Sequence, residues 1–142
     1  MKAVHPYLLF RGNTAEAFEF YEQVFDSKVM GTMHFRDFGE DGGMGLAEDE
    51  LDLIANTALP LTDGVLLMGN DVPASMDPDL RVGGNVQITL DVEDAAEAHR
   101  LFDRLAEGGK KRQELTQTSF AELYGEVTDR FGTSWIIILG SD

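Results

Sequence analysis

The sequence predicts an α+β fold built from two βαβββ modules, and three observations carry this prediction. The order strand, polar turn, amphipathic helix and three strands occurs twice along the 142 residues. Shifting the second half back by 81 positions, the distance from Ala17 to Ala98, also aligns Leu90 with Leu9. Each module alone is too small to bury its sheet, so two modules of one chain or of two chains are expected to share a core.

The first module is predicted over residues 1–70. Residues 4–10 form a short apolar strand, and Asn13 or Thr14 then caps an amphipathic helix. The apolar side of this helix follows a 3.6-residue period: Ala17, Phe18, Tyr21, Val24 and Phe25. Residues 28–38 are predicted as the second strand. Residues 37–49 are predicted as a Gly-rich acidic loop. Residues 51–59 and 65–69 are expected to pair as strands around the turn at Asp63-Gly64.

A linker is predicted at residues 71–84, which contain two prolines and no periodic pattern. The second module, residues 85–142, repeats the first. It begins with a strand at residues 85–92 and continues with a helix whose apolar positions are Ala98, Leu101, Phe102 and Leu105. The helix ends at Gly108-Gly109, and residues 110–120 form the next strand.

Residues 122–139 are predicted to form the β-hairpin around which the second module is organised. Its first strand alternates, with Glu122, Tyr124 and Glu126 on one face. Gly132 provides the positive φ that the turn needs, and an apolar strand follows at residues 135–139. A strand this apolar is expected to be central in the sheet and buried on both faces.

Composition excludes several classes of function. The formal charge of −15 and the isoelectric point near 4.3 argue against a nucleic-acid partner, since phosphate binding depends on clustered Lys and Arg. The chain has no cysteine, which excludes disulfides and thiolate sites and favours a cytoplasmic location. It shows no signal peptide and no apolar run of membrane-spanning length, so no membrane association is expected.

Three segments together resemble a known superfamily: HPYLLFRGNTAEAFEFYEQVF near the start, DGVLLMGND in the middle and GEVTDRFGTSW near the end. They resemble the vicinal oxygen chelate superfamily, which includes glyoxalase I, extradiol dioxygenases and the bleomycin and fosfomycin resistance proteins. Within it the chain is most similar to the PhnB-like branch, often labelled 3-demethylubiquinone methyltransferase-like. The resemblance implies a curved mixed half-barrel sheet around a cavity, with the helices outside.

The same resemblance implies a metal site in which two His and two carboxylates come from strands one, four, five and eight. His5 stands at the first of these positions and Gln87 at the third. Residues 65–68 contain no carboxylate, and Ile136 stands where a Glu is expected. The site is therefore predicted to be degraded. A divalent metal such as Mn, Fe, Ni or Zn could use only His5 and Gln87 from this set.

Strand alternation predicts which side chains line the cavity. The predicted pocket consists of His5, Tyr7, Phe35, Met68, Gln87, Phe120, Tyr124 and Trp135. A mostly apolar pocket with a few polar groups is the usual design of a small-molecule site. The candidates for a catalytic role are His5 and Glu122. His5 is either a polar contact in the pocket or a structural residue at a strand end, and Glu122 is a general base if its face points inward.

Three functions from different classes remain open on these grounds. The first is a binding protein of the bleomycin-resistance type that holds an unidentified small molecule in a dimer pocket. The second is a metal-dependent lyase, isomerase or dioxygenase with a nonstandard ligand set. The third is a scaffold whose own side chains fill the cavity. The resemblance and the exposed linker predict a homodimer in which modules of two chains pair.

Overall fold

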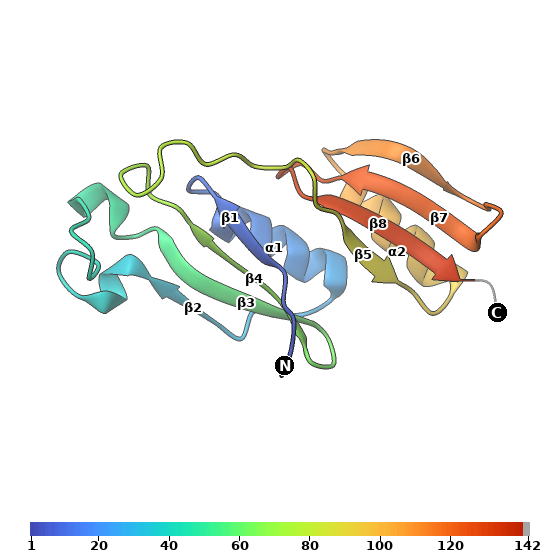
Figure 1. Ribbon diagram of the computed structural model, residues 1–142. Coiled ribbons are helices and arrows are strands. Elements are labelled where there is room, and N and C mark those ends of the chain that lie inside the picture. Colours follow the sequence, from blue (N-terminus) through green and yellow to red (C-terminus); the bar gives the residue numbers. More distant parts are fainter. Residues whose placement is uncertain (141–142) are drawn as a thin grey trace. The chain divides into compact units, whose positions relative to one another are not determined.

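The computed structural model describes residues 1–140. This part of the chain contains two four-stranded sheets, each with one α-helix against one face (Figure 1). The chain divides into two compact units, Met1–Arg81 and Val82–Asp142. Residues 141 and 142 of the predicted second module lie outside the described residues. Neither helix in residues 1–140 is long and apolar enough to cross a membrane.

The first unit has the predicted βαβββ order. Its elements are β1 (Tyr7–Phe10), α1 (Thr14–Phe25), β2 (Gly31–His34), the short 3-10 helices η1 (Phe35–Phe38) and η2 (Glu48–Glu50), β3 (Ile54–Thr62) and β4 (Val65–Asp71). The strands lie in the order β1-β4-β3-β2, with β1 parallel to β4 and the other pairs antiparallel.

The second unit repeats this topology. Its elements are β5 (Ile88–Asp91), α2 (Ala95–Ala106), β6 (Lys110–Thr116), β7 (Ala121–Thr128) and β8 (Ser134–Gly140). The strand order is β5-β8-β7-β6, again with one parallel and two antiparallel pairs. The first strands begin 81 positions apart, and so do the helices. The two βαβββ modules predicted from the sequence are therefore confirmed.

The second predicted strand of the first unit is shorter than expected. The strand predicted at residues 28–38 covers only Gly31–His34, because Phe35 turns into a buried cluster with Leu46 and Leu51. The adjoining turn is closed by Asp37, whose Oδ2 accepts a hydrogen bond from the His34 backbone N–H at 2.8 Å.

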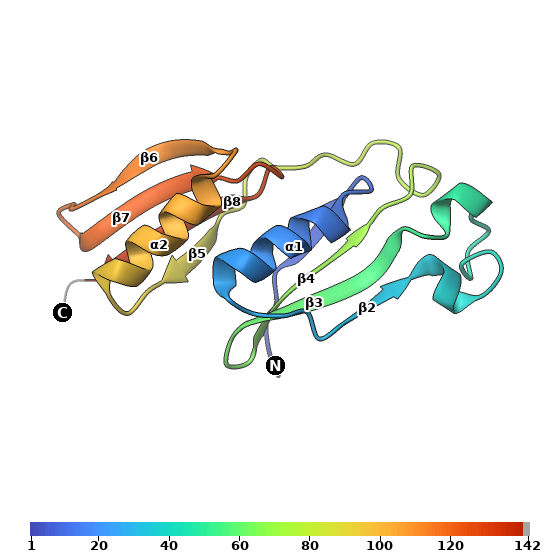
Figure 2. The same cartoon turned by 180° about the vertical axis from the view of Figure 1, so that it is seen from behind.

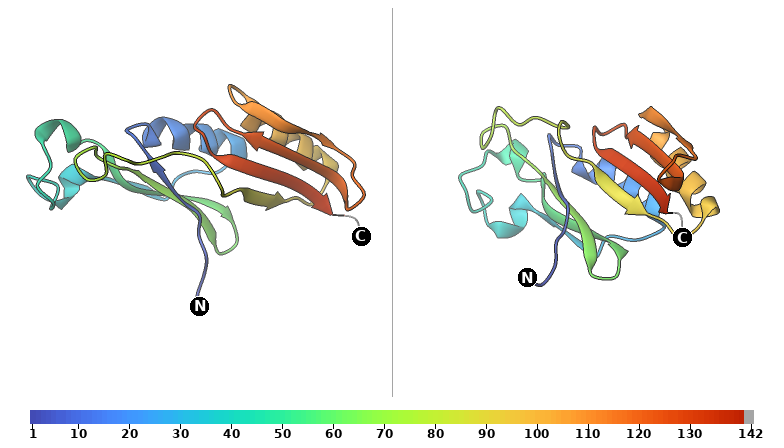
Figure 3. Two further views of the ribbon diagram at one scale, coloured as in Figure 1. Left: turned by 45° about the horizontal axis from the view of Figure 1, so that its top comes forward. Right: turned by 45° about the vertical axis from the view of Figure 1, so that its right-hand side comes forward.

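Strand β8 is central, as predicted, since it pairs with both β5 and β7 (Figure 3). It is not buried on both faces within its unit. Trp135, Ile137 and Leu139 are buried, whereas Ile136 and Ile138 are only half-buried. The strand thus has one covered face and one that is partly open.

The start of α1 is held differently from the prediction. The Asn13 side chain makes no capping hydrogen bond. The buried carboxylate of Asp71, at the end of β4, accepts hydrogen bonds from the Thr14 N–H at 3.0 Å and the Thr14 hydroxyl at 2.6 Å. Its other oxygen accepts from the Ile54 N–H at 2.8 Å. One carboxylate therefore ties α1, β3 and β4 together.

The turn between β7 and β8 is organised by a second buried carboxylate, that of Asp129. Its Oδ1 accepts from the N–H groups of Phe131 and Thr133, at 2.9 and 3.1 Å. Its Oδ2 accepts from the Trp135 indole N–H at 2.9 Å. The spacing of Asp, Phe-Gly and Trp in residues 129–135 thus serves a structural purpose: it fixes the turn and locks the tryptophan under α2.

Candidate functional site

The sheet face of the second unit that lies away from α2, which we call the second open face, carries apolar, aromatic and charged side chains. Gly125 shows which face is which, because a Cβ added to it would lie 2.8 Å from the Phe102 ring of α2. Its neighbours Tyr124 and Glu126 consequently point to the opposite face. Figure 2 shows α2 on the covered face of the sheet.

Apolar side chains form the middle of the second open face. Ile136 and Ile138 of β8 stand opposite Glu126 and Tyr124 of β7 in the antiparallel register. Phe120, immediately before β7, packs its ring edge-on against Tyr124 with the ring centroids 5.2 Å apart. This gives an apolar and aromatic strip with polar groups at its margin, the usual composition of a small-molecule site.

A hydrogen-bonded polar group borders this strip. The Gln87 amide Nε2, just before β5, donates to Glu126 Oε1 at 2.7 Å. Partial burial, together with the charge and hydrogen bond of Glu126, raises the pKa of Tyr124 above its usual value. Tyr124 therefore stays a neutral hydroxyl over a wider pH range than an exposed tyrosine, able to donate or accept a hydrogen bond.

A polar hollow of about 370 Å³ lies at the end of this face where β8 begins. Its walls come from the segment before β5, from β6, β7 and β8, and from the β7–β8 turn: Val82, Gly83, Gly84, Gln87, Arg112, Glu126, Thr128, Gly132 and Ser134. The hydroxyls of Thr128 and Ser134 lie 3.4 Å apart. We call this hollow the Arg112 pocket.

The first unit has a corresponding open face, away from α1. A Cβ on Gly69 would lie 2.8 Å from the Phe18 ring of α1, so its neighbour Met68 faces the other way. Tyr7 stands beside Met68, and Tyr7 and Leu9 keep 45% and 43% of their surface exposed. The Tyr7 hydroxyl accepts from the Asn56 amide at 3.4 Å. This face is apolar and carries no charged side chain at these positions.

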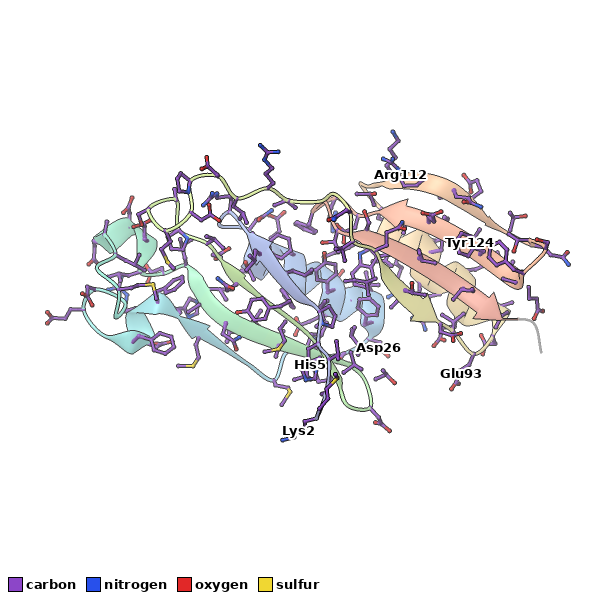
Figure 4. The ribbon with its side chains drawn as sticks, viewed as in Figure 1. Lys2, His5, Asp26, Glu93, Arg112 and Tyr124 are labelled. Carbon is purple, nitrogen blue, oxygen red and sulfur yellow. The ribbon has the colours of Figure 1, made fainter. Side chains whose placement is uncertain are left out.

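His5 lies just before β1, and its ring is already engaged. Its Nδ1 accepts a hydrogen bond from the Leu66 N–H at 3.0 Å, which links the start of the chain to β4 (Figure 4). A neutral imidazole that accepts at Nδ1 carries its proton on Nε2, so it presents a donor and not a metal-binding lone pair. The structural role considered for His5 is thus the one the geometry favours.

Two of the predicted pocket residues belong to the core instead. Phe35 is buried with Leu46 and Leu51, and Trp135 has no exposed surface and lies on the α2 side of β8. Tyr124 and Trp135 were both expected on the cavity wall, but they lie on opposite faces of the sheet. Tyr7 and Met68 share the first open face, and Gln87, Phe120 and Tyr124 contribute to the second.

Glu122, the second catalytic candidate, is exposed and lies at a register shift between Ala121 and Leu123, so strand alternation does not place it on the face of Tyr124 and Glu126. It also lines a shallow acidic hollow with Asp91, Glu93 and Asp94. The Gln87–Glu126 contact and the position of Arg112 were not predicted. Strand alternation did place Glu126 beside Tyr124 on one face, but the link to Gln87 spans 39 positions.

The metal site that the superfamily implies does not fit the residues present. On the open faces, β4 offers Leu66, Met68 and Asn70, and β8 offers Ile136. Within residues 1–140, no three His, Cys, Asp or Glu side chains gather closely enough to hold a metal ion. The two strands expected to supply a carboxylate, β4 and β8, thus present none at these positions on the open faces.

Comparison with known proteins gives a consistent assignment. The sequence model of a family described as 3-demethylubiquinone-9 3-methyltransferase matches residues 2–138. The chain is 33% identical to protein PA1353 from Pseudomonas aeruginosa, with a TM-score of 0.83 and coverage of 99% of this chain and 98% of that one.

Two further solved structures show the same fold at lower identity. A putative 3-demethylubiquinone-9 3-methyltransferase, PhnB protein, from Bacillus cereus is 21% identical, with a TM-score of 0.71 over 96% of this chain and 98% of that one. A glyoxylase/bleomycin resistance protein/dioxygenase domain from Frankia sp. is 13% identical, with a TM-score of 0.62 over 99% and 97%.

Proposed function

The chain belongs to the PhnB-like family described as 3-demethylubiquinone-9 3-methyltransferase, within the vicinal oxygen chelate superfamily. From that premise we propose that it binds a small organic molecule on the second open face. One observation carries the proposal. An uncovered apolar strip, with Ile136 and Ile138 at its centre, is bordered by the hydrogen-bonded side chains of Gln87, Tyr124 and Glu126. Apolar surface would bind the body of a ligand, and these polar groups would orient it.

Methyl transfer is not part of the proposal, although the family's description names it. A nucleotide-like methyl donor is usually held by a Gly-rich turn between a strand and a helix. The turn from β1 to α1 is Arg11-Gly12-Asn13, and the turn from β5 to α2 is Val92-Glu93-Asp94. Neither turn is Gly-rich.

A ligand screen with a matched pair of variants tests the proposal. Thermal unfolding would be followed for the wild type, Glu126→Gln and Asp103→Asn in the presence of a library of small aromatic and aliphatic molecules. Asp103 is an exposed residue of α2, so both variants remove one negative charge but only one alters the second open face.

We expect some molecules to raise the melting temperature of the wild type and of Asp103→Asn, and to lose most of this effect with Glu126→Gln. A ligand at about 100 times its Kd stabilises the folded protein by about 2.7 kcal/mol, which is readily detected. Equal stabilisation of Glu126→Gln and the wild type would contradict the proposal, as would a library in which nothing binds.

We further propose that the protein is a homodimer in which modules of two chains pair. The exposed apolar side chains Tyr7, Leu9 and Met33, each at least 43% exposed on the first unit, support this, because association would remove them from water. Sedimentation equilibrium at micromolar concentration is expected to give the mass of two chains. The mass of one chain would contradict the proposal.

A further inference from the structure

The Arg112 pocket contains two opposite charges that do not neutralise each other. Arg112 and Glu126 both line it, yet no ion pair or hydrogen bond joins them, and Arg112 has no ion-pair partner among residues 1–140. Glu126 is held by Gln87 instead.

The position of Arg112 depends on a β-bulge. Along β6, Lys111 pairs with Val127 and Gln113 pairs with Glu126, so Arg112 is an extra residue opposite a continuous partner strand. Lys111 lies over the Phe102 ring, 5.5 Å from its centroid, on the α2 side. In a regular ladder Arg112 would stand directly opposite Glu126, but the bulge places Gln113 there and leaves Arg112 on the pocket wall without a cross-strand partner in the ladder. Arg112 and Tyr124 come from neighbouring strands (Figure 4).

From this arrangement we propose that the Arg112 pocket binds a zwitterionic small molecule. Its acidic group would lie against Arg112 and its ammonium group against Glu126. This inference rests on the proposed function, since it names the class of ligand that the second open face takes. A simple anion would be attracted by Arg112 but repelled by Glu126, and a simple amine would meet the reverse, so the two charges together select a molecule that carries both.

The surroundings of the pocket specify the rest of the ligand. Ile136 stands opposite Glu126 in the register, and the Tyr124 ring follows two residues along β7. A side group extending from the charged end would therefore cover an apolar and aromatic strip. The hydroxyls of Thr128 and Ser134 can accept or donate further hydrogen bonds at the charged end. A zwitterion with an apolar or aromatic side group, such as an aromatic amino acid, has this chemistry.

Three matched probes test the proposal: phenylalanine, 3-phenylpropanoate, which lacks the ammonium group, and phenethylamine, which lacks the carboxylate. Their affinities would be measured by calorimetry or NMR titration with the wild type, Arg112→Gln and Glu126→Gln. Arg104→Gln and Asp103→Asn, which change exposed side chains of α2, are the matched controls for charge. Circular dichroism checks that each variant is folded.

We expect phenylalanine to bind the wild type at least about tenfold more tightly than either truncated probe, a difference of about 1.4 kcal/mol. With Arg112→Gln, phenylalanine should no longer bind more tightly than phenethylamine. With Glu126→Gln, it should no longer bind more tightly than 3-phenylpropanoate. Both control variants should still bind phenylalanine more tightly than either truncated probe. Equal affinity for phenylalanine and 3-phenylpropanoate would overturn the proposal in favour of a simple anion site. If library molecules bind but none of the three probes does, this inference fails and the proposed function stands.

Discussion

The two units share one topology but stabilise their helices in different ways. The N-terminus of α1 depends on Asp71, a buried side chain 57 positions away at the end of β4. The N-terminus of α2 is capped by its own Asp94, whose Oδ1 accepts from the Glu97 N–H at 2.8 Å. The same local fold is thus held by a tertiary contact in one unit and by a local one in the other.

The open faces differ as well. The first presents Tyr7, Leu9 and Met68 with no charged group among them, whereas the second combines apolar residues with the charged side chains of Glu126 and Arg112. Repetition of a βαβββ module therefore fixes the scaffold but not the chemistry of the face it exposes. In this chain the polar and charged side chains that can orient a ligand lie on the open face of the second unit.

The largest expected effect is on the core of the second unit. Trp135→Ala should destabilise the protein by about 3–5 kcal/mol, because it removes a fully buried indole and leaves a cavity under α2. It also removes a hydrogen-bond donor to Asp129. Chemical denaturation measures the change. A nearly unchanged free energy of unfolding would show that Trp135 faces solvent and would return it to the predicted pocket.

The next effect tests the tertiary anchor of α1. Asp71→Ala leaves buried N–H donors of Thr14 and Ile54 without their acceptor, so a loss of about 3 kcal/mol is expected from the unmade hydrogen bonds. Urea denaturation gives the value. A loss below about 1 kcal/mol would mean that water replaces the carboxylate, and that the anchor contributes little.

The local cap of α2 should matter less. Asp94→Ala is expected to cost about 1 kcal/mol, the usual value for an N-cap whose freed N–H can reach water. The same denaturation experiment compares it with Asp71→Ala. If the two variants lose equal stability, the contrast between a tertiary and a local anchor is wrong.

The smallest effect concerns the second open face. Glu126→Gln removes the carboxylate charge that helps to raise the pKa of Tyr124, so this pKa should fall, while burial keeps it above the usual value. The pH dependence of the Tyr124 ring carbon signals in NMR reports it, with Asp103→Asn as the unchanged control. An unchanged Tyr124 pKa in Glu126→Gln would show that Glu126 does not influence Tyr124.

Local patterns in the sequence predicted the elements well. The spacing of Ala17, Phe18 and Tyr21, and its repeat at Ala98 and Phe102, predicted both helices because the stripe that faces a sheet is a local property. The order of elements then predicted the two modules. The family followed from the same segments, and the matched residues 2–138 confirm it.

Orientation and long-range contacts could not be predicted in this way. Alternation separates the two faces of a strand but does not say which one a helix covers, so Trp135 was assigned to the wrong side. Gly125 was the available signal, since a glycine inside a strand often marks a close approach of another element. The bulge at Arg112 and the contact of Asp71 with Thr14 depend on pairing between distant residues.

The most direct test of ligand binding on the second open face is an NMR titration of the wild type with the tightest ligand found in the screen, read residue by residue. We predict that the largest amide shifts fall at Gln87, Glu126 and Ile136, with little change along α2. Shifts confined to α2, or to the hollow in the first unit lined by α1, β2 and β3, would contradict the claim that the second open face is the binding surface.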